Sequence, residues 1–356
     1  MILNYRKLKE LAEVNWYIGD CAARILGYSY NKKMEEFVDR ISQIDSITDI
    51  QNFYNMMKEV PEAWHGSYYT YKRIFSENTL YGYAHEILKY AGLSDNQIFY
   101  MPLLQHGIPY GVDLDLSRLN RNSAYIFQGR AGQEIWEANI PKEKAYYVGP
   151  YIHYSQSYYT KSQMKSLKHQ LGKTLLLFLP HSCEFESMSI HLNDIIEKYE
   201  KTNHESIDTI IACIYYADLT QELIDWVNKQ SNFRLVCSGF KLDSNFVRRL
   251  RTILELADNV IFNSFSSSIG YAYYLGKNII CDIDDDELKQ CFDSYGEDGK
   301  VKLVKFKELF DNSDVTDQAK YAFINHYWGI EDIKTPVDMR KIIKENKYKI
   351  ISHLGF

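Results

Sequence analysis

A serine-rich run at residues 263–268 carries the clearest chemical potential in the sequence, because it directly follows an apolar segment. Its serines are Ser264, Ser266, Ser267 and Ser268. At the start of a helix, hydroxyl groups, free backbone N–H groups and the helix dipole together favour a bound phosphate. Gly270 would allow a phosphate to approach closely. Serine also suits the plain capping of a buried helix, so the run predicts either a phosphate site or an extended cap.

Two other apolar segments in the same half of the chain end in polar residues. His181 and Ser182 follow the first of these segments, and Ser238 and Gly239 follow a later one. Ligands of open parallel sheets bind outside the carboxyl ends of the strands. A protonated His181 would pair with a phosphate or assist its departure, whereas a histidine with a structural role is the alternative. We expect these four residues to join the serine run in one ligand site.

The N-terminal half offers candidates for a general base. His106 lies in a Gln-His-Gly loop after a strand-like run, and the ordinary pKa of histidine lies near neutrality. A structural use of His106 is the alternative. Asp113 and Asp115 follow shortly and provide a carboxylate instead. The sequence leaves the choice among these three residues open.

No strong metal or cofactor motif is present. Paired carboxylates at Asp113 and Asp115 and at residues 282–287 could bind Mg²⁺ or Mn²⁺. The first pair lacks an apolar strand to deliver it, and the second run is long enough to be a solvated loop. Glycine-rich motifs of NTPases and dehydrogenases are missing, as are spaced Cys/His sets. We therefore expect neither a catalytic metal nor a cofactor.

The C-terminal half predicts a doubly wound parallel sheet. Apolar runs typical of buried strands alternate with helical patterns. The expected strands are residues 173–180, 208–216, 233–239, 259–264 and 278–284, and the expected helices are residues 187–202, 220–231, 245–257 and 267–276. The serine run and the other strand ends of this half therefore lie at one edge of the sheet.

The N-terminal half predicts helices followed by a smaller α/β unit. Helical periodicity covers residues 5–14, 31–41 and 76–92. Strand-like runs at residues 98–108, 123–129 and 144–154 enclose a short helical pattern at 131–140. A polar stretch at residues 155–172 marks the boundary. We expect an α/β unit with a helical N-terminal region at 1–160, a doubly wound unit at 170–330 and a C-terminal helix at 331–356. That helix either packs back across both units or contacts an anionic membrane.

Composition and charge exclude several protein classes. The 356 residues include 46% hydrophobic and 25% charged residues, as in globular proteins with cores. A net charge of -6 argues against a nucleic-acid partner. No apolar run approaches the ~20 residues of a membrane helix, and the pattern at residues 5–14 is unlike a signal peptide. We expect a cytoplasmic protein with free thiols, and the inner face of the membrane is the alternative location.

The motifs together resemble the GT-B class of nucleotide-sugar glycosyltransferases. Residues 257–284 resemble the donor-binding strand–serine–helix–strand stretch of bacterial capsule and surface-polysaccharide transferases. Residues 179–182 (LPHS) are similar to their His-Pro motif. Residues 105–107 (QHG), followed by 146–154, resemble the acceptor domain of CDP-glycerol polymerase relatives. The combination resembles transferases that use CMP-sialic acid, CMP-Kdo or CDP-glycerol, in spaced motifs within residues 95–290.

The resemblance implies an α/β fold with two Rossmann-like domains and a helical N-terminal segment. It implies that His181 contacts the donor phosphate, that residues 266–268 hold that phosphate, and that His106 faces the acceptor. The implied partners are a nucleotide sugar and a glycan or lipid-linked glycan, as in capsule or lipopolysaccharide synthesis. We therefore expect an inverting, metal-independent glycosyltransferase. A nucleotide-sugar epimerase of the same fold and a non-catalytic nucleotide- or glycan-binding protein are the alternatives.

Overall fold

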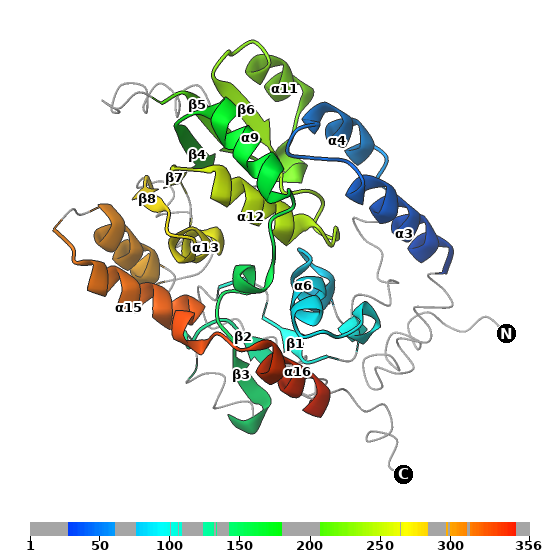
Figure 1. Cartoon of the computed structure of the whole chain (residues 1–356), viewed down its shortest axis with the longest axis vertical. Helices are drawn as coiled ribbons and strands as arrows, with labels where there is room; N and C mark the ends of the chain where they lie inside the picture. The colour runs from blue at the N-terminus through cyan, green and yellow to red at the C-terminus, as the bar shows by residue number, and fades with distance from the viewer. Residues whose placement is uncertain are drawn as a thin grey trace.

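The computed structural model describes large parts of both predicted units (Figure 1). The described residues are 28–60, 76–99, 101–105, 107–108, 124–131, 133, 142–179, 207–263, 265–283, 297, 300–311 and 314–346.

The larger sheet contains five parallel strands in the order β6-β5-β4-β7-β8. These strands are β4 (Thr174–Phe178), β5 (Thr209–Cys213), β6 (Phe233–Val236), β7 (Asn259–Phe262) and β8 (Asn278–Cys281). Alternate residues of the central strands face two separate cores: Leu176 and Val260 belong to one, and Leu175 and Ile261 belong to the other. Because both faces are covered, a central strand needs apolar residues at every position. The five predicted strands are confirmed.

In the part of the chain that the structure describes, three helices connect the strands of this sheet. They are α11 (Gln221–Val227), α12 (Phe246–Leu256) and α13 (Ser268–Tyr274). Each lies where periodicity predicts it, and Thr220 caps α11 by accepting a hydrogen bond from the N–H of Leu223 at 3.2 Å. The fourth predicted helix, at residues 187–202, lies outside the described residues. Residues 300–311 form a further helix after the sheet.

The smaller sheet is also parallel, in the order β1-β2-β3. Its strands are β1 (Leu103–Leu104), β2 (Tyr125–Phe127) and β3 (Ala145–Tyr147). Short 3-10 helices occur in this unit at η3 (Asp95–Phe99), η4 (Lys142–Lys144) and η5 (Tyr151–Tyr154), and in the other at η6 (Tyr216–Asp218). Two parallel sheets with helices confirm the predicted α/β class.

The helix predicted at residues 76–92 is divided in two. The chain forms α5 (Ser76–Thr79) and α6 (Tyr83–Tyr90), separated by Tyr81 at φ 57° and Gly82 at φ 70°. A Cβ on Gly82 would lie 2.2 Å from the backbone oxygen of Ser244. The two positive φ angles break the helical path although the periodicity continues through it, and the second unit leaves no room for a side chain at residue 82.

The N-terminal helices α3 (Tyr28–Ser42) and α4 (Ile50–Met57) pack on the larger sheet (Figure 1). Phe37 and Phe53 are buried in the same core as strands β4, β5 and β6. The hydroxyl of Ser46 also donates to the backbone oxygen of Cys237 at 2.6 Å. Residues 28–60 therefore extend the second unit, although the sequence places them with the first.

A helix that the sequence did not reveal follows the connection between the sheets. It is α9 (Lys161–Leu171), within the stretch predicted as a boundary. Thr160 and Gln163 form a capping box at its start, whereas none of its residues is buried. Its polarity explains why an apolar pattern did not indicate it; the Thr-x-x-Gln spacing is the signal that would have done so.

The C-terminal part of the chain contains α15 (Asp317–Trp328), η7 (Ile330–Asp332) and α16 (Pro336–Glu345). In α16, Met339, Ile342 and Ile343 are buried in the core that the smaller unit shares with one face of the larger sheet. The guanidinium of Arg340 donates through Nε to the backbone oxygen of Ala91 at 2.6 Å. The apolar face of α16 is thus covered by protein, which favours the packing alternative over membrane contact. Among the described helices, none is both long and apolar enough to cross a bilayer.

Candidate functional site

The larger sheet contains a switch point between β4 and β7. From β4 the chain continues to β5 and β6 on one side, and it then returns to β7 and β8 on the other side. Loops that leave such a pair of strands diverge to opposite faces and open a crevice at the carboxyl edge, where ligands of α/β sheets bind. The serine run follows β7, and His181 follows β4 outside the described residues.

Residues 266–268 of the serine run form a turn at the start of α13, called the serine turn below. Only some of its hydroxyl groups serve to cap the helix. The Ser266 hydroxyl accepts a hydrogen bond from the N–H of Ser268 at 3.3 Å. Ser267 occupies the N-cap position of α13, and its side chain makes no capping hydrogen bond among the described residues. Ser267 is half-buried, whereas Ser268 is 9% exposed. Capping therefore accounts for Ser266 and leaves the Ser267 hydroxyl available to a ligand.

The loop after β1 meets this turn. A Cβ placed on Gly107 would lie 3.9 Å from Oγ of Ser267, and Gly107 has φ 69°. Gln105 directly follows β1, and its N–H donates to the backbone oxygen of Ile126 at 2.8 Å. The carboxyl end of β1 therefore lies beside the turn that follows β7, where Gly107 meets Ser267. Neither loop is near the other in sequence.

The carboxyl ends of β2 and β3 are closed by the end of α15. A Cβ on Gly129 would lie 2.5 Å from the backbone carbon of Tyr327, and one on Gly149 would lie 2.7 Å from Cγ1 of Ile333. The N–H groups of residues 130 and 131 donate to the backbone oxygen of His326 at 2.8 and 3.0 Å. The edge of the smaller sheet is thus covered at β2 and β3, and the end of β1 faces the serine turn.

Ser238 and Gly239 lie in a tightly packed loop of the second unit. Ser238 is 5% exposed, and Gly239 has φ 105°. A Cβ on Gly239 would lie 2.7 Å from Nη1 of Arg249 and 3.3 Å from Oδ2 of Asp243. Gly239 therefore makes room for a buried ion pair, a role that the sequence did not suggest.

Asn263 and Asp282 lie at the carboxyl ends of the neighbouring strands β7 and β8. Nδ2 of Asn263 donates to the backbone oxygen and Oδ2 of Asp282, at 3.3 and 3.2 Å. Oδ1 of Asn263 is buried, and no described group donates to it. Among the described residues, this amide oxygen is an acceptor without a donor at the start of the serine run.

Six predicted site residues lie outside the described residues. They are His106, Asp113, Asp115, His181, Ser182 and Ser264. The flanking residues Gln105, Gly107 and Leu179 are described, so the points at which the two histidine-bearing loops leave β1 and β4 are known.

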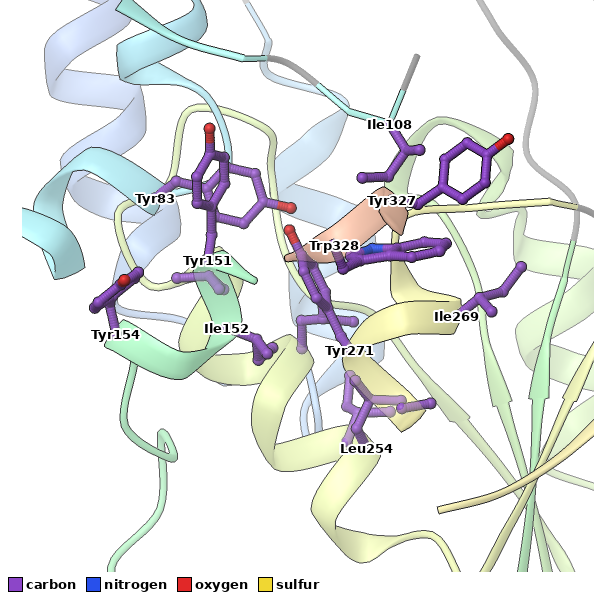
Figure 2. Packing of buried hydrophobic residues seen from close by; sticks show 14 of the residues in the cluster. Tyr83, Ile108, Tyr151, Ile152, Tyr154, Leu254, Ile269, Tyr271, Tyr327 and Trp328 are labelled. Carbon is purple, nitrogen blue, oxygen red and sulfur yellow. The ribbon is translucent and has the colours of Figure 1, made fainter. Parts of the chain in front are cut away.

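Gly270 has a different role from the expected one. A Cβ on Gly270 would lie 2.1 Å from the indole ring of Trp328. Trp328, the last residue of α15, is fully buried (Figure 2). The missing side chain therefore admits an indole, not a phosphate. A glycine within the first turn of a helix indicates such a contact, but the sequence cannot identify the partner.

Three buried tyrosines, Tyr83, Tyr151 and Tyr271, lie near one another (Figure 2). The ring of Tyr83 lies 5.2 Å from that of Tyr151 and 6.3 Å from that of Tyr271, between centroids. The first two come from the smaller unit, and Tyr271 belongs to α13. Burial raises the pKa of all three hydroxyls well above the ordinary value, so they stay protonated. They pack the two units together and do not act as bases.

The described cysteines are free and buried. Burial raises the pKa of Cys237 and of Cys281 to about 12, and it also raises that of Cys213. Because the thiolate is the reactive form, these thiols are inert at neutral pH. Within the described ranges, no three His, Cys, Asp or Glu side chains are arranged to hold a metal ion.

A separate polar surface cleft of about 420 Å³ lies between α6 and the loop before α12. Nδ1 of His85 lies 3.5 Å from Oδ2 of Asp95 and makes no hydrogen bond within the described ranges, whereas Oε2 of Glu86 accepts from the N–H of Gln156 at 3.3 Å. None of the predicted site residues that the structure describes lines it.

Gln128 supports the Gln-His-Gly loop, although sequence analysis did not single it out. It is 1% exposed at the end of β2. Its N–H donates to Oε1 of Gln105 at 3.3 Å, and its own Oε1 accepts from the N–H of Tyr151 at 3.4 Å. A polar residue directly after an apolar strand was the available signal.

Comparisons with known proteins leave the family of this chain open. No protein-family model and no curated protein matches the sequence. Among solved structures, the chain is similar to Arabidopsis thaliana UGT89C1 complexed with UDP-L-rhamnose. That match covers 89% of this chain and 72% of the other, at 12% identity and a TM-score of 0.32.

Proposed function

We propose that this protein is a glycosyltransferase that moves a sugar from a nucleotide-activated donor to a glycan acceptor. The observation that carries the proposal is the meeting of the Gln-His-Gly loop with the serine turn, where Gly107 faces Oγ of Ser267 at the edges of two parallel sheets. A donor held at the turn and an acceptor held by the smaller unit would then lie beside each other. Such proximity removes much of the entropic barrier to transfer.

In the proposed mechanism, the serine turn holds the departing nucleotide. Ser267 donates its free hydroxyl to a donor phosphate oxygen, and the start of α13 adds its dipole. His181 contacts the same phosphate. Donors fixed in advance stabilise the negative charge that develops as the sugar–oxygen bond breaks. We include Ser182, Ser264 and Ser268 in the donor site, with Ser238 and Gly239 as a supporting loop.

The smaller unit provides the base in this proposal. An acceptor hydroxyl attacks the anomeric carbon from the side opposite the nucleotide, which inverts the configuration. Its proton passes to His106, or to Asp113 or Asp115, as the new bond forms. The nucleotide leaves with the electron pair of the broken bond, and no metal takes part. The motif resemblance favours a CMP- or CDP-linked donor and a glycan acceptor of surface-polysaccharide synthesis.

The test is to incubate the protein with CMP-, CDP-, UDP- and GDP-sugars and to measure released nucleotide and isomerised donor, with and without EDTA. We expect nucleotide release or transfer from a cytidine donor, unchanged by EDTA. An isomerised donor would identify an epimerase, and binding without turnover would identify a non-catalytic protein. Either result would contradict the proposal.

Replacing Ser267 with alanine should lower donor turnover about 10- to 100-fold, because a hydrogen bond to a charged phosphate contributes about 1.5–3 kcal/mol. The unfolding temperature should stay nearly unchanged, since this hydroxyl makes no capping bond. Ser266→Ala is the matched variant: it removes the acceptor for the N–H of Ser268 and should mainly lower stability. Equal turnover in wild type and Ser267→Ala would remove Ser267 from the site.

A further inference from the structure

The last turn of α15 touches the serine turn directly. Nε1 of Trp328 donates to the backbone oxygen of Ser267 at 3.0 Å. The indole ring also fills the space where Gly270 has no side chain. In Figure 2 the indole lies among Ile108, Ile269 and Tyr271, beneath the ring of Tyr327. Trp328 therefore contacts the start of α13 through both its polar N–H and its apolar ring.

Both the C=O and the N–H of the peptide unit between Ser267 and Ser268 are hydrogen-bonded. In a trans peptide the C=O and N–H groups point in opposite directions. The oxygen of the unit between Ser267 and Ser268 accepts from Trp328, and its N–H donates to the Ser266 hydroxyl. Rotation of this peptide would break both bonds. The pair therefore restrains the backbone from which the Ser267 side chain projects.

The same end of α15 is held by the smaller unit. The backbone oxygen of His326 accepts from two N–H groups after β2. A Cβ on Gly329 would lie 2.4 Å from the backbone oxygen of Gln128. The end of α15 thus contacts both the residues after β2 and, through Trp328, the serine turn. It therefore links the serine turn to the smaller unit.

We propose that Trp328 is a positioning residue for phosphate recognition by the serine turn. Its indole N–H holds the 267–268 peptide in the orientation that places the Ser267 hydroxyl beside the loop after β1. The identity of the ligand rests on the proposed function. The restraint that Trp328 places on the 267–268 peptide does not depend on it.

The test compares full-length wild type with Trp328→Phe, which removes the N–H but keeps an aromatic ring. Trp226→Phe is the matched control, because Trp226 packs on Phe233 in the core on the other face of the sheet. Two quantities are measured: hydrogen exchange of the Ser268 amide without ligand, and the dissociation constant of CDP. We expect about tenfold faster exchange and about tenfold weaker CDP binding in Trp328→Phe only.

The outcomes separate the inference from the proposed function. Unchanged exchange and unchanged CDP affinity in Trp328→Phe would overturn the positioning role. If exchange and CDP affinity change as much in Trp226→Phe, the effect is general destabilisation and the inference is also wrong. If wild type binds no CDP, CMP, UDP or GDP, the proposed function fails, but faster exchange confined to Trp328→Phe would still support the restraint on the 267–268 peptide.

Discussion

Replacing Asp243 with alanine is expected to lower the free energy of unfolding by about 3–5 kcal/mol, because it leaves a buried charge without its partner. Asp243 pairs with Arg249, and both side chains are fully buried. The other terminal nitrogen of Arg249 donates to the backbone oxygens of Ser42 and Ile44, each at 2.9 Å. The pair thus fastens the end of α3 beneath the Gly239 loop. Urea unfolding followed by circular dichroism would measure the loss.

An exposed ion pair provides the control for Asp243. Nη2 of Arg40 lies 2.9 Å from Oε2 of Glu59, with the two side chains 55% and 53% exposed. Because water screens such a pair, Glu59→Ala should change the free energy of unfolding by less than about 1 kcal/mol. If Asp243→Ala costs no more than Glu59→Ala, the buried pair is not what holds α3 to the sheet.

The second large effect is expected at Gly82, where alanine should cost about 2–5 kcal/mol of stability. Its φ of 70° is unfavourable for any residue with a Cβ. The added Cβ would also meet the backbone oxygen of Ser244 at 2.2 Å, a contact that backbone cannot easily relieve. The shift would reach the site, since Tyr83 follows directly and packs on Tyr271. We therefore expect lower donor turnover together with the lower unfolding temperature.

Gly276 is the matched control for Gly82, because its φ is 69° and nothing lies within 4 Å of its added Cβ. Gly276→Ala should carry only the conformational cost, about 1–2 kcal/mol, with turnover unchanged. The difference between the two variants isolates the contact between the units. Equal losses would show that the contact at Ser244 yields without cost.

Several features of this protein could be predicted from local patterns alone. A central strand such as β4 (Thr174–Phe178) is buried on both faces, so its continuous apolar run identifies it without knowledge of its neighbours. The rule that ligands bind at carboxyl strand ends then indicates the serine run and the Gln-His-Gly loop. Both the α/β class and the segments of interest follow from such short-range information.

The tertiary structure decided which of these segments meet. Periodicity shows that one side of a segment is buried, but it does not show what covers that side. The sequence therefore could not predict that α3 packs on the larger sheet, that Gly82 interrupts a helical pattern against Ser244, or that Gly270 receives an indole and not a phosphate. The approach of Gly107 to Ser267 joins residues 160 positions apart. Such contacts depend on how two sheets and α15 pack together, which no local pattern of residues encodes.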